Sequence, residues 1–546
     1  TPVKFNKTTR KDASVLMSSA RAGIVVPAGY VPLLPGDSAS GRVGIDIQLK
    51  EMPKPLLNAV HANVQAWVIP KSAHPKFAGR DELQHAFTGE VIKALGAPDR
   101  TPPAYFTLLN GAAWNTAVNS PMFNTLGLHP VPNVPLNTDL IDAFQLVYNF
   151  RLAAHSSRLP RRKYAAEDVA EATSMQRAFW PSSRFSRVVP DYERALMVGA
   201  LDLDVAAGRL PVSGIGIAPV GAATTPGPKN YMSYEGTQVA ADHWRVGENI
   251  SGPEIVVEKA ATGLRTKIFA EMAGQAVTVS LADIDKARTT QAFARLRTAY
   301  AGNDTTGFDN DDTLVSMLMQ GLPVSEDDFK RPWLLDSKRV PVGFAERFAT
   351  DAANLDQSVT LGRASAVLSL NVPALPEGGV IVFTIEVLPE RVDERMSDEW
   401  LQAGSVDDLP NALRDVQRTE PVDLVLNRRI DAKHASPNQI YGYEPMNDKW
   451  NRDTTRLGGD FYMATPGGGW TENRSAIWQT EIVNPNFSGT HYLAPAPFPH
   501  DVFADTTAHA FEFVCRHTLS ITGLTQIGDI LVEANGDYEA VQSVLD

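Results

Sequence analysis

The residue types that carry out enzymatic chemistry are present in this chain, but not in the spacings that define catalytic motifs. The sequence has no GxxxxGK[ST] phosphate loop, no HExxH zinc pattern, no GxSxG nucleophile motif and no EF-hand loop. Its eleven histidines are scattered without an HxH or HxxxH pair. His509 and His517 lie eight residues apart on one expected strand, where ordinary strand histidines are favoured over metal ligands. We expect no catalytic residue, no cofactor and no enzymatic activity.

Cys515 is the only cysteine, which excludes an intrachain disulfide and a cysteine-based zinc site. Its position in an apolar run predicts a buried, inert thiol. An acidic segment, NDTTGFDNDD, could offer oxygen ligands to Ca²⁺, but its spacing fits no known loop motif. A solvated loop is the favoured interpretation, and a cation site is the weaker one. The candidate ligands are Asp304, Asp309, Asp311 and Asp312.

Two basic segments could contact phosphate. The first is residues 1–14, an expected extended arm with four cations, Lys4, Lys7, Arg10 and Lys11, against one acid. The second is the segment SRLPRRKY, which contains Arg158, Arg161, Arg162 and Lys163. Such clusters repel one another unless they meet phosphate, carboxylate or water. DNA contact, with base stacking by Phe5 or Tyr164, is one interpretation. A solvated loop or an ion-paired subunit interface is the other.

The whole chain is acidic, with a net charge of −13 and a pI near 5.4. This excludes a protein whose entire surface binds nucleic acid, so any such contact is local or assisted by another polycation. Hydrophobic residues make up 43% and charged residues 21%, which indicates a globular protein with an ample core. No apolar run reaches 18 residues, which predicts no membrane span. The polar N-terminus is typical of a processed native start without a signal peptide.

Hydrophobic periodicity predicts a mainly β fold. Residues 43–49 alternate between apolar and polar types, as in a half-buried strand. Further strands are expected at 20–34, 59–69, 358–370, 379–388 and 508–522, and helices at 139–154 and 282–300. Residues 205–280 are rich in Gly, Ala, Pro and Thr and predict a surface insertion, and 389–507 form a long connection. Short, distant strand signals favour a β-sandwich or jelly roll in one domain over 1–546, with strands from 20–70, 185–205, 358–388 and 508–524.

Several segments, in this order, carry a family resemblance. They are Pro35-Gly36-Asp37, Trp67-Val68-Ile69-Pro70, Tyr148-Asn149-Phe150-Arg151, Arg187 with Asp191-Tyr192, Pro332-Trp333-Leu334-Leu335, Leu361-Gly362-Arg363-Ala364, Gly379-Val380-Ile381, and Gly442-Tyr443-Glu444-Pro445 with Trp450 and Arg452. Their order and spacing resemble the major capsid protein of the Microviridae, small tailless single-stranded DNA phages, in a divergent lineage related to gokushoviruses. The sequence departs from the family pattern at Trp333 and at Asp336-Ser337, which replace a Glu and a Gly pair.

The resemblance implies an eight-stranded antiparallel jelly roll with long, partly helical insertions. It implies a sixty-copy T=1 icosahedral shell around circular single-stranded DNA, and therefore a virion protein assembled in the host cytoplasm. Implied partners are other copies of the chain, the packaged DNA, a small basic internal DNA-binding protein, vertex or pilot proteins and a host-surface receptor. The two basic segments would line the inner surface, 205–280 would face outward, and 389–507 would make intersubunit contacts.

Two other function classes remain open from the residues alone. One is a β-sandwich glycoside hydrolase, with two carboxylates as acid and base and with Trp450, Trp470 and Trp478 along a sugar cleft. The other is a receptor-binding or carbohydrate-binding module on the same kind of sandwich.

Overall fold

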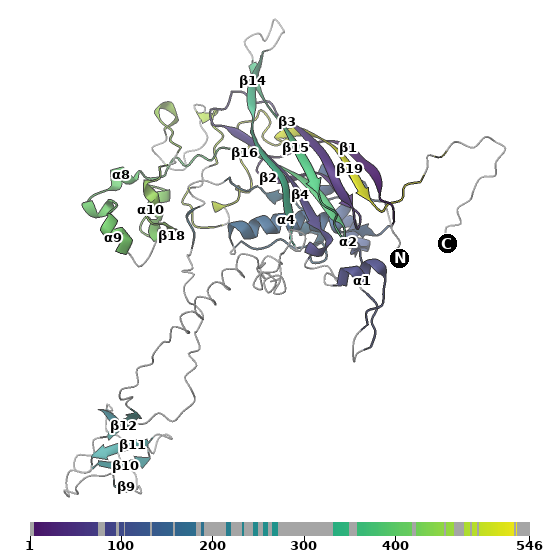
Figure 1. Cartoon of the computed structure of the whole chain (residues 1–546). Helices are drawn as coiled ribbons and strands as arrows, with labels where there is room; N and C mark the ends of the chain where they lie inside the picture. The colour runs from purple at the N-terminus through teal and green to yellow at the C-terminus, as the bar shows by residue number, and fades with distance from the viewer. Residues whose placement is uncertain are drawn as a thin grey trace, which may run out of the picture. The chain divides into compact units, whose positions relative to one another are not determined.

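The protein is mainly β, with antiparallel sheets and few helices (Figure 1). The computed structural model describes residues 5–74, 82–93, 98–102, 104–131, 134–156, 159–181, 187–190, 215–219, 232–233, 244–248, 255–259, 265–270, 331–348, 358–417, 422–452, 455–462, 474–480, 483–488, 491–528 and 531. The chain divides into two compact units, Thr1–Glu193 with Leu296–Asp546, and Arg194–Arg295. The expected insertion 205–280 falls within the second unit, and its outward position stays a prediction.

The first unit contains two five-stranded sheets. Sheet A has the order β1-β19-β3-β15-β14, and sheet B has the order β13-β4-β16-β2-β7. The strands of sheet A are β1 (Thr8–Ala20), β19 (Phe511–Gly523), β3 (Ser38–Leu49), β15 (Ser358–Val372) and β14 (Gly343–Phe348). Those of sheet B are β13 (Trp333–Pro341), β4 (Val60–Pro70), β16 (Gly379–Pro389), β2 (Ile24–Leu33) and β7 (Gln176–Arg177). Figure 1 shows β1, β19, β3 and β15 running side by side.

The main core lies between the two sheets, because each strand turns its alternate side chains inward. From sheet A it receives Val43, Ile45, Ile47, Leu368, Phe513 and Leu519, and from sheet B it receives Val64, Val68, Ile381, Phe383 and Ile385. These side chains are all at most 3% exposed. The alternation of 43–49 is therefore a strand with one face in this core, as the sequence predicts.

A helical layer covers the other face of sheet B. It contains α1 (Leu83–Thr88), α2 (Gly111–Val118), α3 (Pro121–Leu126), α4 (Asp139–His155) and α5 (Val169–Ala172), with the short strands β5 (Leu108–Leu109) and β6 (Leu136–Asn137). A second core fills this interface and contains Phe144 and Val147 from α4 with Trp67, Ile69 and Val382 from sheet B. Central strand β16 is thus buried on both faces.

The long connection after β16 forms a smaller cluster with its own core of Val188, Val425, Ile430 and Tyr441. Its elements are α8 (Glu399–Gln402), α9 (Ala412–Gln417), β17 (Val422–Leu426), α10 (Asn427–Ile430) and β18 (Ile440–Pro445). The second unit contains one sheet in the order β8-β12-β11-β10-β9. Its strands are β8 (Ile215–Pro219), β12 (Arg265–Ala270), β11 (Ile255–Lys259), β10 (Trp244–Glu248) and β9 (Met232–Ser233).

The predicted strands at 43–49, 59–69, 358–370, 379–388 and 508–522 and the predicted helix at 139–154 are confirmed. The prediction that 1–14 is an arm without regular structure is wrong for residues 8–14, which pair with β19. Its inward side chains there are charged: Arg10 meets Asp37, and Asp12 meets His517 at 2.8 Å. The polar side chains Arg10 and Asp12 stand where the apolar alternation that would have revealed the strand is expected, and both have partners from distant parts of the chain. The predicted helix 282–300 and most of the strand expected at 185–205 lie outside the described residues.

An ion pair between Arg151 of α4 and Glu386 of β16 fastens the helical layer to the sheet. The two side chains are only 10% and 2% exposed. The Arg151 guanidinium also lies over the Phe179 ring, 4.1 Å from its centroid. Removing one partner of such a pair leaves the other charge buried without compensation, which is more costly than replacing both.

We therefore predict that Glu386→Leu lowers the free energy of unfolding by about 3–5 kcal/mol, and that adding Arg151→Met restores part of the loss. Urea unfolding of both variants measures this. Arg516→Met is the control, because it breaks the half-exposed Arg516–Asp46 pair and should cost less than about 1 kcal/mol. Equal midpoints for Glu386→Leu and the double variant would show that the two charges are not coupled.

A second prediction concerns Asp142 on the same helix. Burial raises the pKa of its carboxyl from the ordinary 3.8 to about 6, although the Ala165 N–H donates to it at 2.8 Å. Because the folded pKa is the higher one, folding favours the protonated form, and stability falls as pH rises from about 4 to about 6. Asp142→Asn should match the wild type near pH 4 and exceed it by about 1–2 kcal/mol at pH 7. Thermal unfolding across this range tests it; a difference that is constant with pH would refute it.

Candidate functional site

The N-terminal basic segment is the first expected site of phosphate contact. Lys4 lies outside the described residues, and Lys7 is exposed just before β1. The Arg10 guanidinium turns inward and donates to the fully buried Asp37 carboxylate at 2.5 Å and to the Thr525 hydroxyl at 2.8 Å. Arg10 therefore holds a structural ion pair and is not the free cation that the sequence suggested. Lys11 is the next residue on the strand and points away from the core, exposed.

The second basic segment is compensated by acids that follow it in the chain. Arg161 donates two hydrogen bonds to Glu167, both 2.7 Å long. Arg162 lies 3.4 Å from Glu171, and Lys163 lies 3.2 Å from Asp168 and 3.4 Å from Glu171. Hydrogen bonding to Asp168 raises the pKa of Lys163, which keeps the ion pair charged. Three cations thus face three carboxylates.

This pairing shows that the charge of Arg161, Arg162 and Lys163 is compensated within the loop, so DNA contact at these three residues stays a prediction that would require phosphate to displace their acids. The fourth candidate, Arg158, lies outside the described residues. Tyr164 is 2% exposed, so its ring is not free to stack on a base. The carboxylates come five to nine residues after their cations, beyond the SRLPRRKY segment on which the sequence argument relied.

We predict that the double variant Glu167→Gln/Glu171→Gln binds single-stranded DNA more tightly than the wild type, because it frees Arg161 and Arg162 from their acids and leaves Lys163 paired with Asp168 alone. The released ion pairs are partly exposed, so each should contribute less than about 1 kcal/mol to stability. Fluorescence anisotropy with a labelled oligothymidine at low salt measures the affinity. An unchanged affinity would mean that the loop cannot approach DNA whatever its charge.

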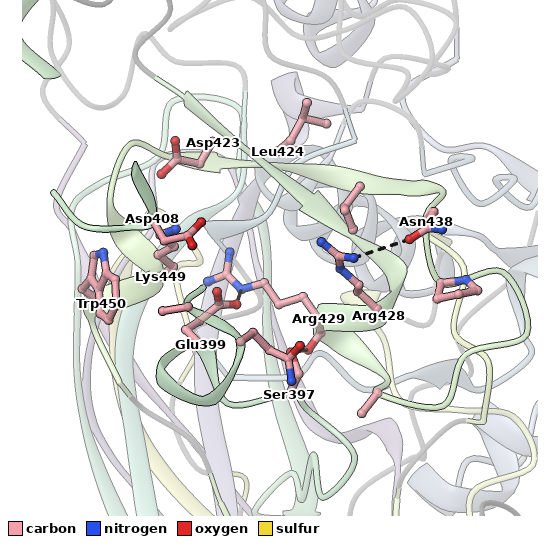
Figure 2. Close-up of a pocket in the computed structure, with 15 residues that line it drawn as sticks. Ser397, Glu399, Asp408, Asp423, Leu424, Arg428, Arg429, Asn438, Lys449 and Trp450 are labelled. Carbon is pink, nitrogen blue, oxygen red and sulfur yellow. Dashed lines mark hydrogen bonds and ion pairs between the residues drawn. The ribbon is translucent and has the colours of Figure 1, made fainter. Parts of the chain in front are cut away.

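A polar pocket of about 490 Å³ lies in the connection after β16 (Figure 2). Its wall combines carboxylates, cations and one indole ring, supplied by Ser397, Glu399, Asp408, Asp423, Arg428, Arg429, Asn438, Lys449 and Trp450 among others. Figure 2 shows Arg429 and Glu399 pointing toward each other, and their Nε and Oε1 atoms are 2.5 Å apart. Arg429 also pairs with the buried Glu444.

The carboxylates of this pocket already have structural partners. Asp408 accepts the N–H groups of Gly404 and Ser405 at 2.8 and 3.0 Å, and Asp423 accepts that of Asn447 at 2.7 Å. Glu399 pairs with Arg429. The pocket can hold a small polar ligand, but its acids are arranged to close turns and compensate arginine. Trp478, another expected wall of a sugar cleft, is fully buried in the main core, and Trp470 lies outside the described residues.

A second, apolar pocket of about 600 Å³ is lined by the helical layer and the ends of β2 and β16. Lys71 is 2% exposed at its wall, 2.5 Å from Asp139 and 4.7 Å from the Tyr105 ring centroid. Burial lowers the pKa of Lys71, and Asp139 opposes that shift. Sequence reasoning missed this group, because Lys71 and Asp139 are 68 residues apart and belong to no motif.

The other residues singled out in the sequence are Cys515, the histidines near the C-terminal strand and the acidic segment. Cys515 is buried, as predicted, and burial raises the pKa of its thiol to about 12. His509 lies outside β19, near Ser19, and His517 is buried beside Asp12. No cluster of His, Cys, Asp or Glu among the described residues could hold a metal ion. Asp304, Asp309, Asp311 and Asp312 lie outside those residues.

None of the helices in the described segments is long and apolar enough to cross a bilayer. No known protein-family model matches the chain, and no curated protein is significantly similar to it.

Proposed function

We propose that this chain is the major capsid protein of a small tailless single-stranded DNA phage, a divergent relative of the Microviridae. Sixty copies would form a T=1 icosahedral shell around circular single-stranded DNA. The observation that carries the proposal is the way in which N-terminal strands pair with C-terminal ones. β1 pairs with β19, β2 with β16 and β3 with β15, all antiparallel.

This nested pairing is what a jelly roll requires. The chain behaves as one long hairpin that is folded over so that successive strands enter opposite sheets. β1 and β3 belong to sheet A, and β2 and β4 belong to sheet B; at the other end, β15 and β19 belong to sheet A and β16 to sheet B. The jelly roll is a common architecture of viral capsid subunits, in which long insertions make the contacts between copies.

The connection after β16 supports a role in assembly. Four large apolar side chains of α8, α9 and the segment between them are strongly exposed: Trp400 at 64%, Leu401 at 79%, Val406 at 81% and Leu413 at 77%. We name these four residues the apolar rim. Exposed apolar groups clustered on one segment mark an interaction surface, since a monomer gains nothing from displaying them to water. In a shell they would be covered by a neighbouring copy.

The net charge of −13 defines the other partners. An acidic subunit cannot neutralise packaged DNA in sum, so the proposal includes a small basic internal protein. Vertex or pilot proteins, a host-surface receptor contacted by the second unit, and location in the virion after assembly in the host cytoplasm belong to the same proposal.

Assembly tests the proposed function directly. Purified protein should sediment as particles of megadalton mass that electron microscopy shows as icosahedral shells. Leu401→Lys/Val406→Lys should abolish particles while leaving thermal unfolding of the subunit unchanged, because the new charges lie in the apolar rim. Gln402→Lys is the matched control, since it places the same charge at an exposed polar position of α8. A wild-type protein that stays at 59.3 kDa would refute the capsid proposal.

A carbohydrate-binding module is the second candidate, and the polar pocket is the observation that favours it. Trp450 contributes an indole ring to a wall that also offers Arg428 and Asn438. Aromatic rings beside hydrogen-bonding groups suit a sugar ligand. Glycan-array binding by a stable monomer, lost in Trp450→Ala, would support this candidate over the shell.

A further inference from the structure

The two sheets differ in what covers their outer faces. The outer face of sheet B is packed beneath the helical layer, whereas that of sheet A remains exposed over β1, β19, β3 and β15. We name this second surface the open face. Along β19, for example, the outward residues Glu512, Arg516, Thr518 and Ser520 are exposed, and the intervening residues are buried. The open face is therefore a four-stranded surface that no element of the described residues covers.

Strand register places cations among hydroxyl groups on the open face. Lys11 lies opposite Ser520, which lies opposite Ser40. In the next row, Thr518 lies opposite Arg42, which lies opposite Ser369. Residues in register on neighbouring strands are about 5 Å apart, so Arg42 has a hydroxyl on each side and Lys11, on the edge strand, has one. No aromatic residue points outward from these four strands among the described residues. Their outward positions are Thr9, Lys11, Ala13, Val15, Met17, Ser19, Ser38, Ser40, Arg42, Gly44, Asp46, Gln48, Val359, Leu361, Arg363, Ser365, Val367, Ser369, Asn371, Glu512, Val514, Arg516, Thr518, Ser520 and Thr522.

The charge of the open face is opposite to that of the chain. Its two acids are already compensated, Asp46 by Arg516 at 2.9 Å and Glu512 by Lys50. Lys11, Arg42 and Arg363 are exposed and have no acidic partner within the described residues. At the margin of the face, Lys338 donates to the Val367 carbonyl of β15, and Asp336 accepts the Ser369 N–H of the same strand. Their opposite charges leave the net charge of the face unchanged. The face thus carries three uncompensated positive charges on a protein whose net charge is −13.

We propose that the open face binds the phosphodiester backbone of single-stranded DNA without reading its bases. Lysine, arginine and hydroxyl groups are the side chains that contact phosphate, and they fix position without conveying sequence. Stacking of bases needs aromatic rings, which this face does not offer. The proposal rests on the proposed function, because the packaged genome of the shell is the ligand. It relocates DNA contact from the two basic segments to a surface formed by four strands distant in sequence.

The triple variant Lys11→Gln/Arg42→Gln/Arg363→Gln tests the proposal. Anisotropy with labelled oligothymidine and oligodeoxyadenosine should show equal affinities for the wild type and a loss of about tenfold or more for the variant at low salt. Each lost phosphate contact reduces the slope of log K against log salt by about 0.7, so the slope should fall by about 2. Arg161→Gln/Arg162→Gln/Lys163→Gln removes the same charge from the paired loop and should leave both measures unchanged.

Sedimentation of the same proteins separates the outcomes. Particles that form normally from the triple variant but retain less DNA support the proposal. The proposal is overturned if the triple variant binds DNA like the wild type. If that variant also loses assembly while it keeps its DNA affinity, the open face is a contact between copies. If the wild type forms no particles, the capsid function is refuted. The open face would still be identified as a DNA-binding surface if the wild type binds DNA and the triple variant does not. Equal melting temperatures exclude misfolding.

Discussion

The burial of β16 on both faces is the constraint on which the rest of the structure depends. One side of the strand packs Ile381, Phe383 and Ile385 into the core between the sheets, and the other packs Val380 and Val382 beneath α4. A strand in this position must be apolar almost throughout, and the one charge that it carries, Glu386, needs the cation of Arg151. The same strand pairs with β2 on one edge and β4 on the other, so displacement of the helical layer would disturb the three central strands of sheet B.

This arrangement leaves the molecule asymmetric in a way that bears on assembly. Helices cover one outer sheet face, and the other stays exposed and carries uncompensated cations among hydroxyl groups. Large apolar side chains are exposed at the apolar rim, and Val15, Met17 and Val367 are exposed on the open face. A subunit whose charged face and apolar rim belong to different elements can bind a polyanion on one surface and neighbouring copies on another.

The sequence predicts the sandwich better than its sites, and the reason lies in the range of the interactions. Alternation over 43–49 and the apolar run over 379–388 are local patterns, so strands could be placed without knowledge of their partners. The β1 strand was missed because its inward positions hold Arg10 and Asp12, whose partners Asp37 and His517 come from elsewhere in the chain. The Lys71–Asp139 pair and the polar pocket were missed for the same reason. Local composition cannot show a compensation that only folding supplies.

The two basic segments show the consequence for function. A cluster of cations in a sequence is evidence of positive charge on the surface only if no acid pairs with it after folding. The cations at 161–163 pair with Glu167, Asp168 and Glu171, five to nine residues further along the chain. On the open face the cations are dispersed over three strands and form no cluster in the sequence, yet their neighbours in register are mostly hydroxyls. Electrostatic attraction to a polyanion depends on charge that remains uncompensated on the folded surface. For this acidic protein, therefore, register in a sheet shows where positive charge stays uncompensated, which the density of lysine and arginine along the chain does not.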